Sequence, residues 1–304
     1  MIVLTKVREL HVSPSAGGER AYLSAASGLV RAGPYLYVVA DDELHLGVFR
    51  TTSDGPGHRV RLFAGELPAS KPERKKLKPD LEALLKLPAS ERFPNGALLA
   101  LGSGSTHMRR MGALLYLDSN GALAAMPQPV DLTPILKPLG RAFDGLNIEG
   151  AVVVGDEVRL FQRGNRGGSA NAIIRFALVP FFDTLISPRE SDLEPLAIHW
   201  TDLGDTCGIP FSFTDAAALP NGDVLFTAIA EDTEDTYNDG ACVASAIGIL
   251  SADGKLRRLV PLAAPHKIEG VDARVEGGVI TLLLVTDADD PEIPAVLYSA
   301  TMER

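Results

Sequence analysis

Short apolar runs recur along the chain at wide intervals, and each opens with a small polar or acidic residue followed by a small one. Residues 146–153 read Leu-Asn-Ile-Glu-Gly-Ala-Val-Val, and residues 267–271 read Lys-Ile-Glu-Gly-Val. Looser copies stand at residues 80–84, 26–30 and 213–217. After each opening come a turn with Gly or Asn-Gly and a second apolar run that ends in polar residues. This order predicts a strand, a tight turn and a returning strand in every unit.

The spacing of the openings indicates a repeat architecture. The equivalent positions are separated by 55, 67, 65 and 55 residues; they are Ser27, Glu82, Glu149, Thr214 and Glu269. The 35 residues after Glu269 and the 27 that lead to Ser27 together make about one more unit. Repeats of this size with strand content are typical of propellers. A final unit divided between the two ends of the chain favours a closed ring.

The sequence therefore predicts an all-β, five-bladed β-propeller that forms a single domain over residues 1–304. Residues 5–12 are expected to be the outer strand of the last blade, where they pair with the C-terminal strands. Such pairing closes the ring and removes exposed strand edges. Residues 81–87 fit a short helix or a strand, and the repeat register favours the strand. The basic segment 71–78 is expected to be a solvated loop between blades.

Composition narrows the possible partners and the location. The net charge is −10, which argues against nucleic acid or an anionic membrane as the main partner. A small anionic molecule remains compatible if a cation or local arginines hold it. No apolar run approaches the roughly 20 residues that span a bilayer, and no export signal opens the chain. With only Cys207 and Cys242, the chain fits a reducing cytoplasm. The oligomeric state stays open.

The five repeat openings predict a metal site. In a propeller the first strand of each blade lines the channel, so equivalent positions form a ring. Three carboxylates that converge there need protons or a shared cation. Oxygen ligands suit Ca²⁺, or less well Mg²⁺. The candidate ligands are Ser27, Glu82, Glu149, Thr214 and Glu269. Alternatively, Glu-Gly is only a strand-opening device, in which Glu caps backbone amides and Gly permits close packing.

The second strands of the blades end in polar residues at the same mouth of the channel. Arginine suits an anionic substrate, because its guanidinium matches phosphate oxygens. A carboxylate there can serve as the base for an attacking water. The catalytic candidates are Asp41, Arg163, Arg109 and Glu231. The substrate-binding candidates are Ser105, His107, Asn165 and Asp287. The alternative for any of them is a solvated loop residue or an Arg–carboxylate pair between blades.

The openings resemble those of the calcium-dependent nucleotidase (apyrase) family, in which Ser-Gly-Leu, two Glu openings, Ser-Asp and Glu-Gly-Ile follow in blade order. This chain has Ser27-Gly28-Leu29, Glu82-Ala83-Leu84, Glu149-Gly150-Ala151, Thr214-Asp215 and Glu269-Gly270-Val271, and it departs at Thr214. The segments Asn-Ile-Glu-Gly and Arg-Gly-Asn are also similar to bacterial phytase-like (esterase-like phytase) propeller domains. The resemblance implies a central calcium and phosphate-ester substrates. It also places the segment that ends in Asp41 at the active site.

These observations leave two main functional hypotheses. One is a metal-dependent phosphohydrolase that acts on a nucleotide, phytate or another phosphate ester at the channel mouth. The other is a non-catalytic propeller with a structural cation that binds a small molecule or a protein. A lactonase or glycosidase is a weaker alternative, because other propellers use a central calcium or paired carboxylates for those reactions.

Overall fold

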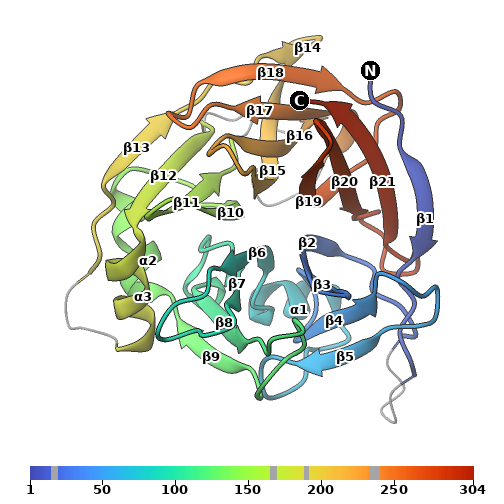
Figure 1. Cartoon of the computed structure of the whole chain (residues 1–304). Coiled ribbons are helices and arrows are strands. Elements are labelled where there is room, and N and C mark those ends of the chain that lie inside the picture. The colour runs from blue at the N-terminus through green and yellow to red at the C-terminus, as the bar shows by residue number, and fades with distance from the viewer. Residues whose placement is uncertain (15–19, 165–169, 188–191, 233–239) are drawn as a thin grey trace.

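The computed structural model describes residues 1–14, 20–164, 170–187, 192–232 and 240–304. Its strands form five antiparallel sheets that stand around a central axis (Figure 1). The five-bladed all-β propeller predicted from the repeats is therefore confirmed. None of the helices that the structure describes is long and apolar enough to cross a membrane.

Each blade is a sheet whose first long strand reaches nearest the axis, and in blade four an extra two-residue strand pairs with the start of that strand. Blade one contains β2 (Ala26–Ala32), β3 (Tyr35–Ala40), β4 (His45–Arg50) and β5 (His58–Arg61). Blade two contains β6 (Leu81–Leu87), β7 (Ala97–Gly102), β8 (Met111–Tyr116) and β9 (Gln128–Asp131). Blade three contains β10 (Ile148–Val154), β11 (Glu157–Gln162), β12 (Ala172–Ala177) and β13 (Ala197–Trp200). Blade four contains β14 (Asp205–Thr206), β15 (Ile209–Ala218), β16 (Val224–Asp232), β17 (Ala241–Leu250) and β18 (Leu256–Pro261).

Blade five is assembled from both ends of the chain. It contains β19 (Ile268–Glu276), β20 (Val279–Thr286), β21 (Val296–Glu303) and, outermost, β1 (Thr5–Glu9). In the β1–β21 pair, Thr5 lies opposite Ser299 and Glu9 opposite Val296. The predicted closure of the ring by the N-terminal strand is thus confirmed, and residues 81–87 form a strand as the register predicted.

The five equivalent positions found in the sequence coincide with an irregularity in the structure. Each innermost strand has a β-bulge at that position, where one residue is left out of the pairing with the second strand. The bulged residues are Ser27, Glu82, Glu149, Thr214 and Glu269. A bulge re-aims the side chain that it carries and bends its strand. The repeat in the sequence therefore reflects a shared local geometry at the axis.

Apolar side chains pack between the blades. Within the described residues they gather in five clusters, each formed by two neighbouring blades. In β7, for example, Leu99 and Leu101 pack toward blade three, whereas Leu98 and Ala100 pack toward blade one. A strand covered on both faces is apolar at every position instead of at alternate ones. This explains the continuous apolar runs that mark the second strands in the sequence.

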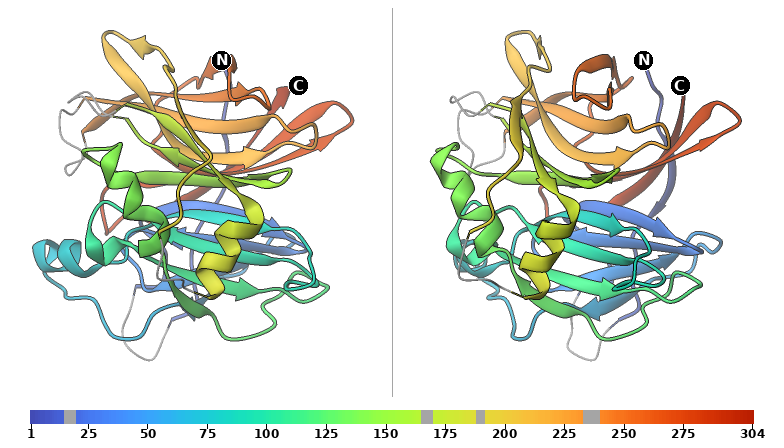
Figure 2. Two further views of the ribbon diagram at one scale, coloured as in Figure 1. Left: turned by 90° about the vertical axis from the view of Figure 1, so that its left-hand side faces the viewer. Right: turned by 60° about the vertical axis from the view of Figure 1, so that its left-hand side comes forward.

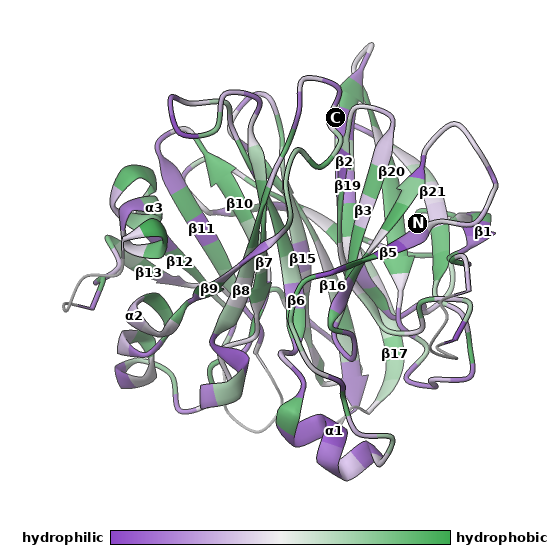
Figure 3. Cartoon of the chain, turned by 90° about the horizontal axis from the view of Figure 1, so that it is seen from below, coloured by the Kyte–Doolittle hydropathy of each residue, from purple (hydrophilic) through white to green (hydrophobic). Residues whose placement is uncertain are grey.

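The helices lie outside the ring that the innermost strands of the five blades form. Blade three carries α2 (Thr133–Leu136), the 3-10 helix η2 (Pro138–Arg141) and α3 (Leu178–Ile186) at its periphery (Figures 1 and 2). The segment expected to be a loop at 71–78 instead contains α1 (Lys71–Leu77), and a short 3-10 helix, η1 (His107–Arg109), follows β7. Pro72 at the start of α1 suits the first helical turn. Figures 2 and 3 show α1, which is largely hydrophilic, projecting beyond the strand ends.

Close approach of the inner strands explains the glycine that follows several bulged residues. A Cβ at Gly150 would lie 3.0 Å from the backbone nitrogen of Ala216, in the next blade. We expect Gly150→Val to lower the free energy of unfolding by about 1–3 kcal/mol, because backbone cannot yield as a side chain does. Urea unfolding measures the change. Gly140→Ala is the control, because a Cβ at Gly140 meets no atom within 4 Å; equal effects of the two variants would contradict the packing argument.

Candidate active site at the mouth of the channel

One mouth of the channel is built from the starts of the inner strands and the ends of the second strands. The same backbone hydrogen bond joins the two in four blades: Asp41 N to Ala25 O, Ser103 N to Asp80 O, Arg163 N to Asn147 O, and Asp287 N to Lys267 O. These bonds lie just beyond the paired strands, on the mouth side of the bulges. Polar side chains from five distant parts of the sequence are therefore held at one end of the ring, as the repeat predicted.

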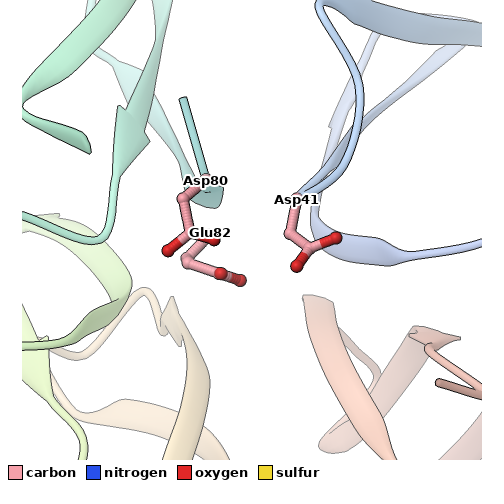
Figure 4. A group of neighbouring side chains, drawn as sticks. All are labelled: Asp41, Asp80 and Glu82. Carbon is pink, nitrogen blue, oxygen red and sulfur yellow. The ribbon is translucent and has the colours of Figure 1, made fainter. Parts of the chain in front are cut away.

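Three carboxylates converge at this mouth between blades one and two. The side chains of Asp80 and Glu82 come from the start of β6, and that of Asp41 follows β3 and faces them (Figure 4). One oxygen from each residue lies within 4.8 Å of the others. Because calcium binds oxygen at about 2.3–2.6 Å, one ion can touch oxygens up to roughly 5 Å apart. The geometry is compatible with one ion held by all three side chains.

Asp80 is the most strongly held member of this group. Its Oδ2 accepts a hydrogen bond from Ser103 Oγ (2.6 Å) and pairs with Arg109 Nη1 (2.8 Å). Its Oδ1 pairs with Lys78 Nζ at 2.9 Å, and the same ammonium also pairs with Asp41. Asp80 has a φ of 56°, a left-handed conformation uncommon outside glycine. Strained backbone of this kind clusters at functional sites and needs surrounding contacts to persist.

A second group of charges continues around the mouth through blades three, four and five. Arg163 pairs with Glu149 (Nη1 to Oε1, 3.3 Å) and with Glu231, and so links β10 to β16. Lys267 Nζ lies 3.7 Å from Glu231 Oε1 and 3.8 Å from Glu269 Oε1. Two buried oxygens, Glu231 Oε1 and Glu269 Oε2, have no hydrogen-bond donor among the described residues. Buried carboxylate oxygens without donors are costly, and a cation would satisfy them.

Burial raises the pKa values of the three ring carboxylates, Glu82, Glu149 and Glu269. It raises the pKa of Glu82 well above its usual range, and the neighbouring charges of Asp80 and Glu149 raise it further. Burial raises the pKa of Glu149 to about 7, although Arg163 opposes the change. The pKa of Glu269 is also well above its usual range because of burial, against the effect of Lys267. Without an added cation the ring therefore favours protonated acids.

Lys78 responds in the opposite way to the same surroundings. Burial lowers its pKa, but the attraction of Asp41, Asp80 and Glu82 is stronger, so that the pKa lies above its usual range. Lys78 is therefore a permanent ammonium at neutral pH, and it cannot serve as a base there.

The two hydroxyl candidates lie in the same ring but have protein partners. Ser27 Oγ donates to Leu81 O of the next blade (2.5 Å), and Thr214 Oγ1 donates to Thr227 Oγ1 (2.9 Å). Both side chains are buried. Their oxygens keep lone pairs after donating, so ligation by Ser27 and Thr214 stays a prediction.

The remaining candidates occupy different depths of the mouth. Arg109 is buried and bound by Asp80, by Ser105 Oγ (3.0 Å) and by Lys75 O (3.1 Å). His107 and Ser105 are exposed beside it. Asp287 is partly buried at the end of β20. Asn165 lies outside the described residues. For these candidates the sequence left an Arg–carboxylate pair between blades as the alternative to a substrate contact. Arg163 makes such a pair, since it joins Glu149 to Glu231.

Three residues central to this mouth were not among the predicted site residues: Lys78, Asp80 and Lys267. A signal for two of them was available. Asp80 and Lys267 each stand two positions before a ring glutamate, and side chains two apart on a strand share a face. Lys78 carried no such signal, because it follows a helix that the sequence did not reveal.

We expect the metal-free protein to lose stability as pH rises from 5 to 8. Glu149 and Asp287 have pKa values raised to about 7, chiefly by burial, so that the folded state holds protons that the unfolded chain releases near pH 4. The stability that these bound protons contribute is fully present below about pH 4 and is lost as the pH rises through about 7. Thermal unfolding in EDTA across this range measures the effect.

Glu149→Gln removes one of these titrating groups and should make the fall in stability shallower. Glu276→Gln, at an exposed position on β19, should leave it unchanged. A melting temperature in EDTA that rises toward pH 8 would contradict this account.

Solved structures with similar folds differ widely in sequence. The catalytic domain of the GH62 α-L-arabinofuranosidase of Coprinopsis cinerea is 11% identical, with a TM-score of 0.54 over 98% of this chain and 96% of that one. A luciferin-regenerating enzyme is 13% identical, with a TM-score of 0.51 over 99% of this chain and 96% of that one. At such identities the likeness shows the propeller fold alone.

Sequence comparison gives a family but no described activity. No curated protein matches the chain. The family match extends over residues 22–302, and it is to neither the nucleotidase family nor the phytase-like domains whose motifs the openings resemble. The resemblance to those families stays a hypothesis. Because the match covers nearly the whole propeller, the chain belongs to the family of unknown function DUF6929.

Proposed function

We propose that the channel mouth binds a calcium ion and hydrolyses a small phosphate ester or anhydride beside it. The observation that carries the proposal is the convergence of Asp41, Asp80 and Glu82 to within 4.8 Å. Glu231 and Glu269 at the same mouth support it, because each has a buried oxygen that lacks a hydrogen-bond donor among the described residues. Hard oxygen ligands of this kind suit calcium.

Glu82 is the ligand on which the proposal depends most. It belongs both to the mouth group with Asp41 and Asp80 and to the ring with Glu149 and Glu269. Burial raises its pKa, and the charges of Asp80, Glu149 and Asp41 raise it further. An ion in either place would use Glu82.

The mouth residues divide the proposed chemistry among them. A bound calcium would supply charge stabilisation for the phosphoryl oxygens. Asp41 is the proposed base for the attacking water, because its side chain is 23% exposed whereas that of Asp80 is 4% exposed. Arg163 is the proposed phosphate ligand; it must exchange part of its pairing with Glu149 and Glu231 for the substrate. Ser105, His107 and Asp287 are the proposed contacts for the rest of the substrate.

One observation favours the non-catalytic alternative. The cations of the mouth are already paired with carboxylates: Arg109 with Asp80, and Arg163 with Glu149 and Glu231. If these pairs persist when an ion is bound, the cation is structural and the mouth is a binding surface. Activity measurements distinguish the two functions.

Calcium should raise the melting temperature of the wild type. An ion that binds only the folded state adds about 2.7 kcal/mol of stability when its concentration is about 100 times the Kd. Glu82→Gln should lose most of this gain, because it removes the ligand shared by both groups. Differential scanning fluorimetry with calcium and with EDTA measures it, and Glu276→Gln is the control. The same calcium response in wild type and Glu82→Gln would sink the proposed site.

The hydrolase proposal predicts calcium-dependent release of phosphate. The screen covers nucleoside di- and triphosphates, phytate and p-nitrophenyl phosphate, each with calcium or EDTA. Arg163→Lys keeps the charge but loses the bidentate fork, so kcat/KM should fall about 10- to 1,000-fold with the fold intact. Asp41→Asn should reduce mainly kcat, by about 10²- to 10⁴-fold.

Arg141→Lys is the matched control, since Arg141 is 72% exposed and pairs only with the exposed Glu194 among the described residues. Calcium binding without release from any substrate would support the non-catalytic alternative.

A further inference from the structure

The ammonium of Lys78 lies where a cation at this mouth would bind. We propose that Lys78 is a built-in competitor of calcium for Asp41 and Asp80, and that calcium binding therefore loosens α1 from the mouth. This inference rests on the proposed cation site, and it names the residue that sets the affinity of that site and a segment that responds to it.

Lys78 and a calcium ion would compete for the same carboxylate oxygens, because few of these oxygens are left without another partner. Asp80 Oδ2 is already used by Ser103 and Arg109, so Oδ1 is the oxygen left for an ion. Lys78 Nζ holds this Oδ1 at 2.9 Å and pairs with Asp41 as well. A calcium ion at its usual distance of about 2.3–2.6 Å from the same oxygens would contact the ammonium. Two cations cannot share that space, so one excludes the other.

The docking of α1 depends on the same charges. The seven-residue helix buries none of its side chains and carries four cations against the single carboxylate of Glu73. Its described contacts with the mouth are polar: Arg74 donates to Asp42 O, and Arg109 donates to Lys75 O (3.1 Å). Lys78 follows the helix directly, and its backbone N–H caps Arg74 O.

A helix this short is unstable unless its surroundings hold it. With no apolar face buried, α1 is held by these hydrogen bonds and, through Lys78 at its end, by the ion pairs with Asp41 and Asp80. Calcium would take the place of Lys78 at Asp41 and Asp80, so that the end of α1 loses these ion pairs, and it would repel the cations of the helix. The ion and the docked helix are therefore alternatives.

The test measures calcium binding and the exposure of α1 in the whole protein. Isothermal titration with calcium compares wild type, Lys78→Met and Lys78→Arg, and hydrogen exchange with mass spectrometry follows the amides of residues 71–77. We expect Lys78→Met to bind calcium at least about tenfold more tightly, whereas Lys78→Arg stays near the wild type. Calcium should speed exchange in 71–77 of the wild type. In Lys78→Met, exchange there should be fast with or without calcium.

Lys71→Met is the matched control. It removes the same charge at the other end of the segment, from the first residue of α1, and no contact of the Lys71 side chain with the mouth is described. Its calcium affinity should change less than threefold. Near-UV circular dichroism of each variant checks the fold. If Lys78→Met fails to fold, Lys78→Arg is the test variant. It retains the positive charge, so it must bind calcium as weakly as the wild type and show the same calcium response of α1.

The outcomes separate this inference from the proposed function. Calcium binding by the wild type with equal or weaker binding by Lys78→Met overturns the competition and leaves the cation site standing. A wild type that binds calcium with no change in residues 71–77 overturns the link to α1. Binding by Lys78→Met alone supports the competition and removes calcium from the function of the wild type. No binding by any variant overturns both.

Discussion

Carboxylates that converge at one end of a closed ring of strands are the constraint on which this molecule depends. The ring cannot open to relieve their repulsion, because its inner strands pack backbone against backbone at positions such as Gly150 and Gly270. The charges must be compensated where they are. In the structure Lys78, Arg163 and Lys267 provide part of the compensation, and raised pKa values of Glu82, Glu149 and Glu269 provide the rest. The ion pairs respond to the excess of negative charge, whereas the raised pKa values come chiefly from burial.

The fold and the position of the ring were predictable from the sequence, because a repeat records geometry that every blade must satisfy. The openings at Ser27, Glu82, Glu149, Thr214 and Glu269 mark β-bulges at the axis, so their spacing found the blades. Closure by residues 5–12 followed from the need to cover strand edges. The positions of Asp80 and Lys267 were also predictable, because each stands two residues before a ring glutamate, Glu82 or Glu269, and alternate residues of a strand share a face.

What the sequence could not supply are the features that lie outside the repeat. The charged residues of α1 carry no apolar period, so a solvated loop was the natural expectation at 71–78. Arg109 pairs with Asp80 and Arg163 with Glu231, and both partners stand far away in the sequence. Pairings of that kind are set by the tertiary arrangement, and neither strand periodicity nor spacing determines them.

The catalytic and structural alternatives correspond to two ends of the same carboxylate cluster. Side-chain exposure falls from 23% at Asp41 to 15% at Arg163 and then to 4–6% at Asp80, Glu149, Glu231 and Glu269. An ion held by Asp41 and Glu82 would lie toward solvent, where a phosphate oxygen or a water can complete its coordination. An ion held by Glu82 together with Glu149 and Glu269 would be bound by buried carboxylates and would stabilise the ring instead. Since Lys78 pairs with Asp41 and Asp80, the proposed competition would act on an ion at the outer end of the cluster.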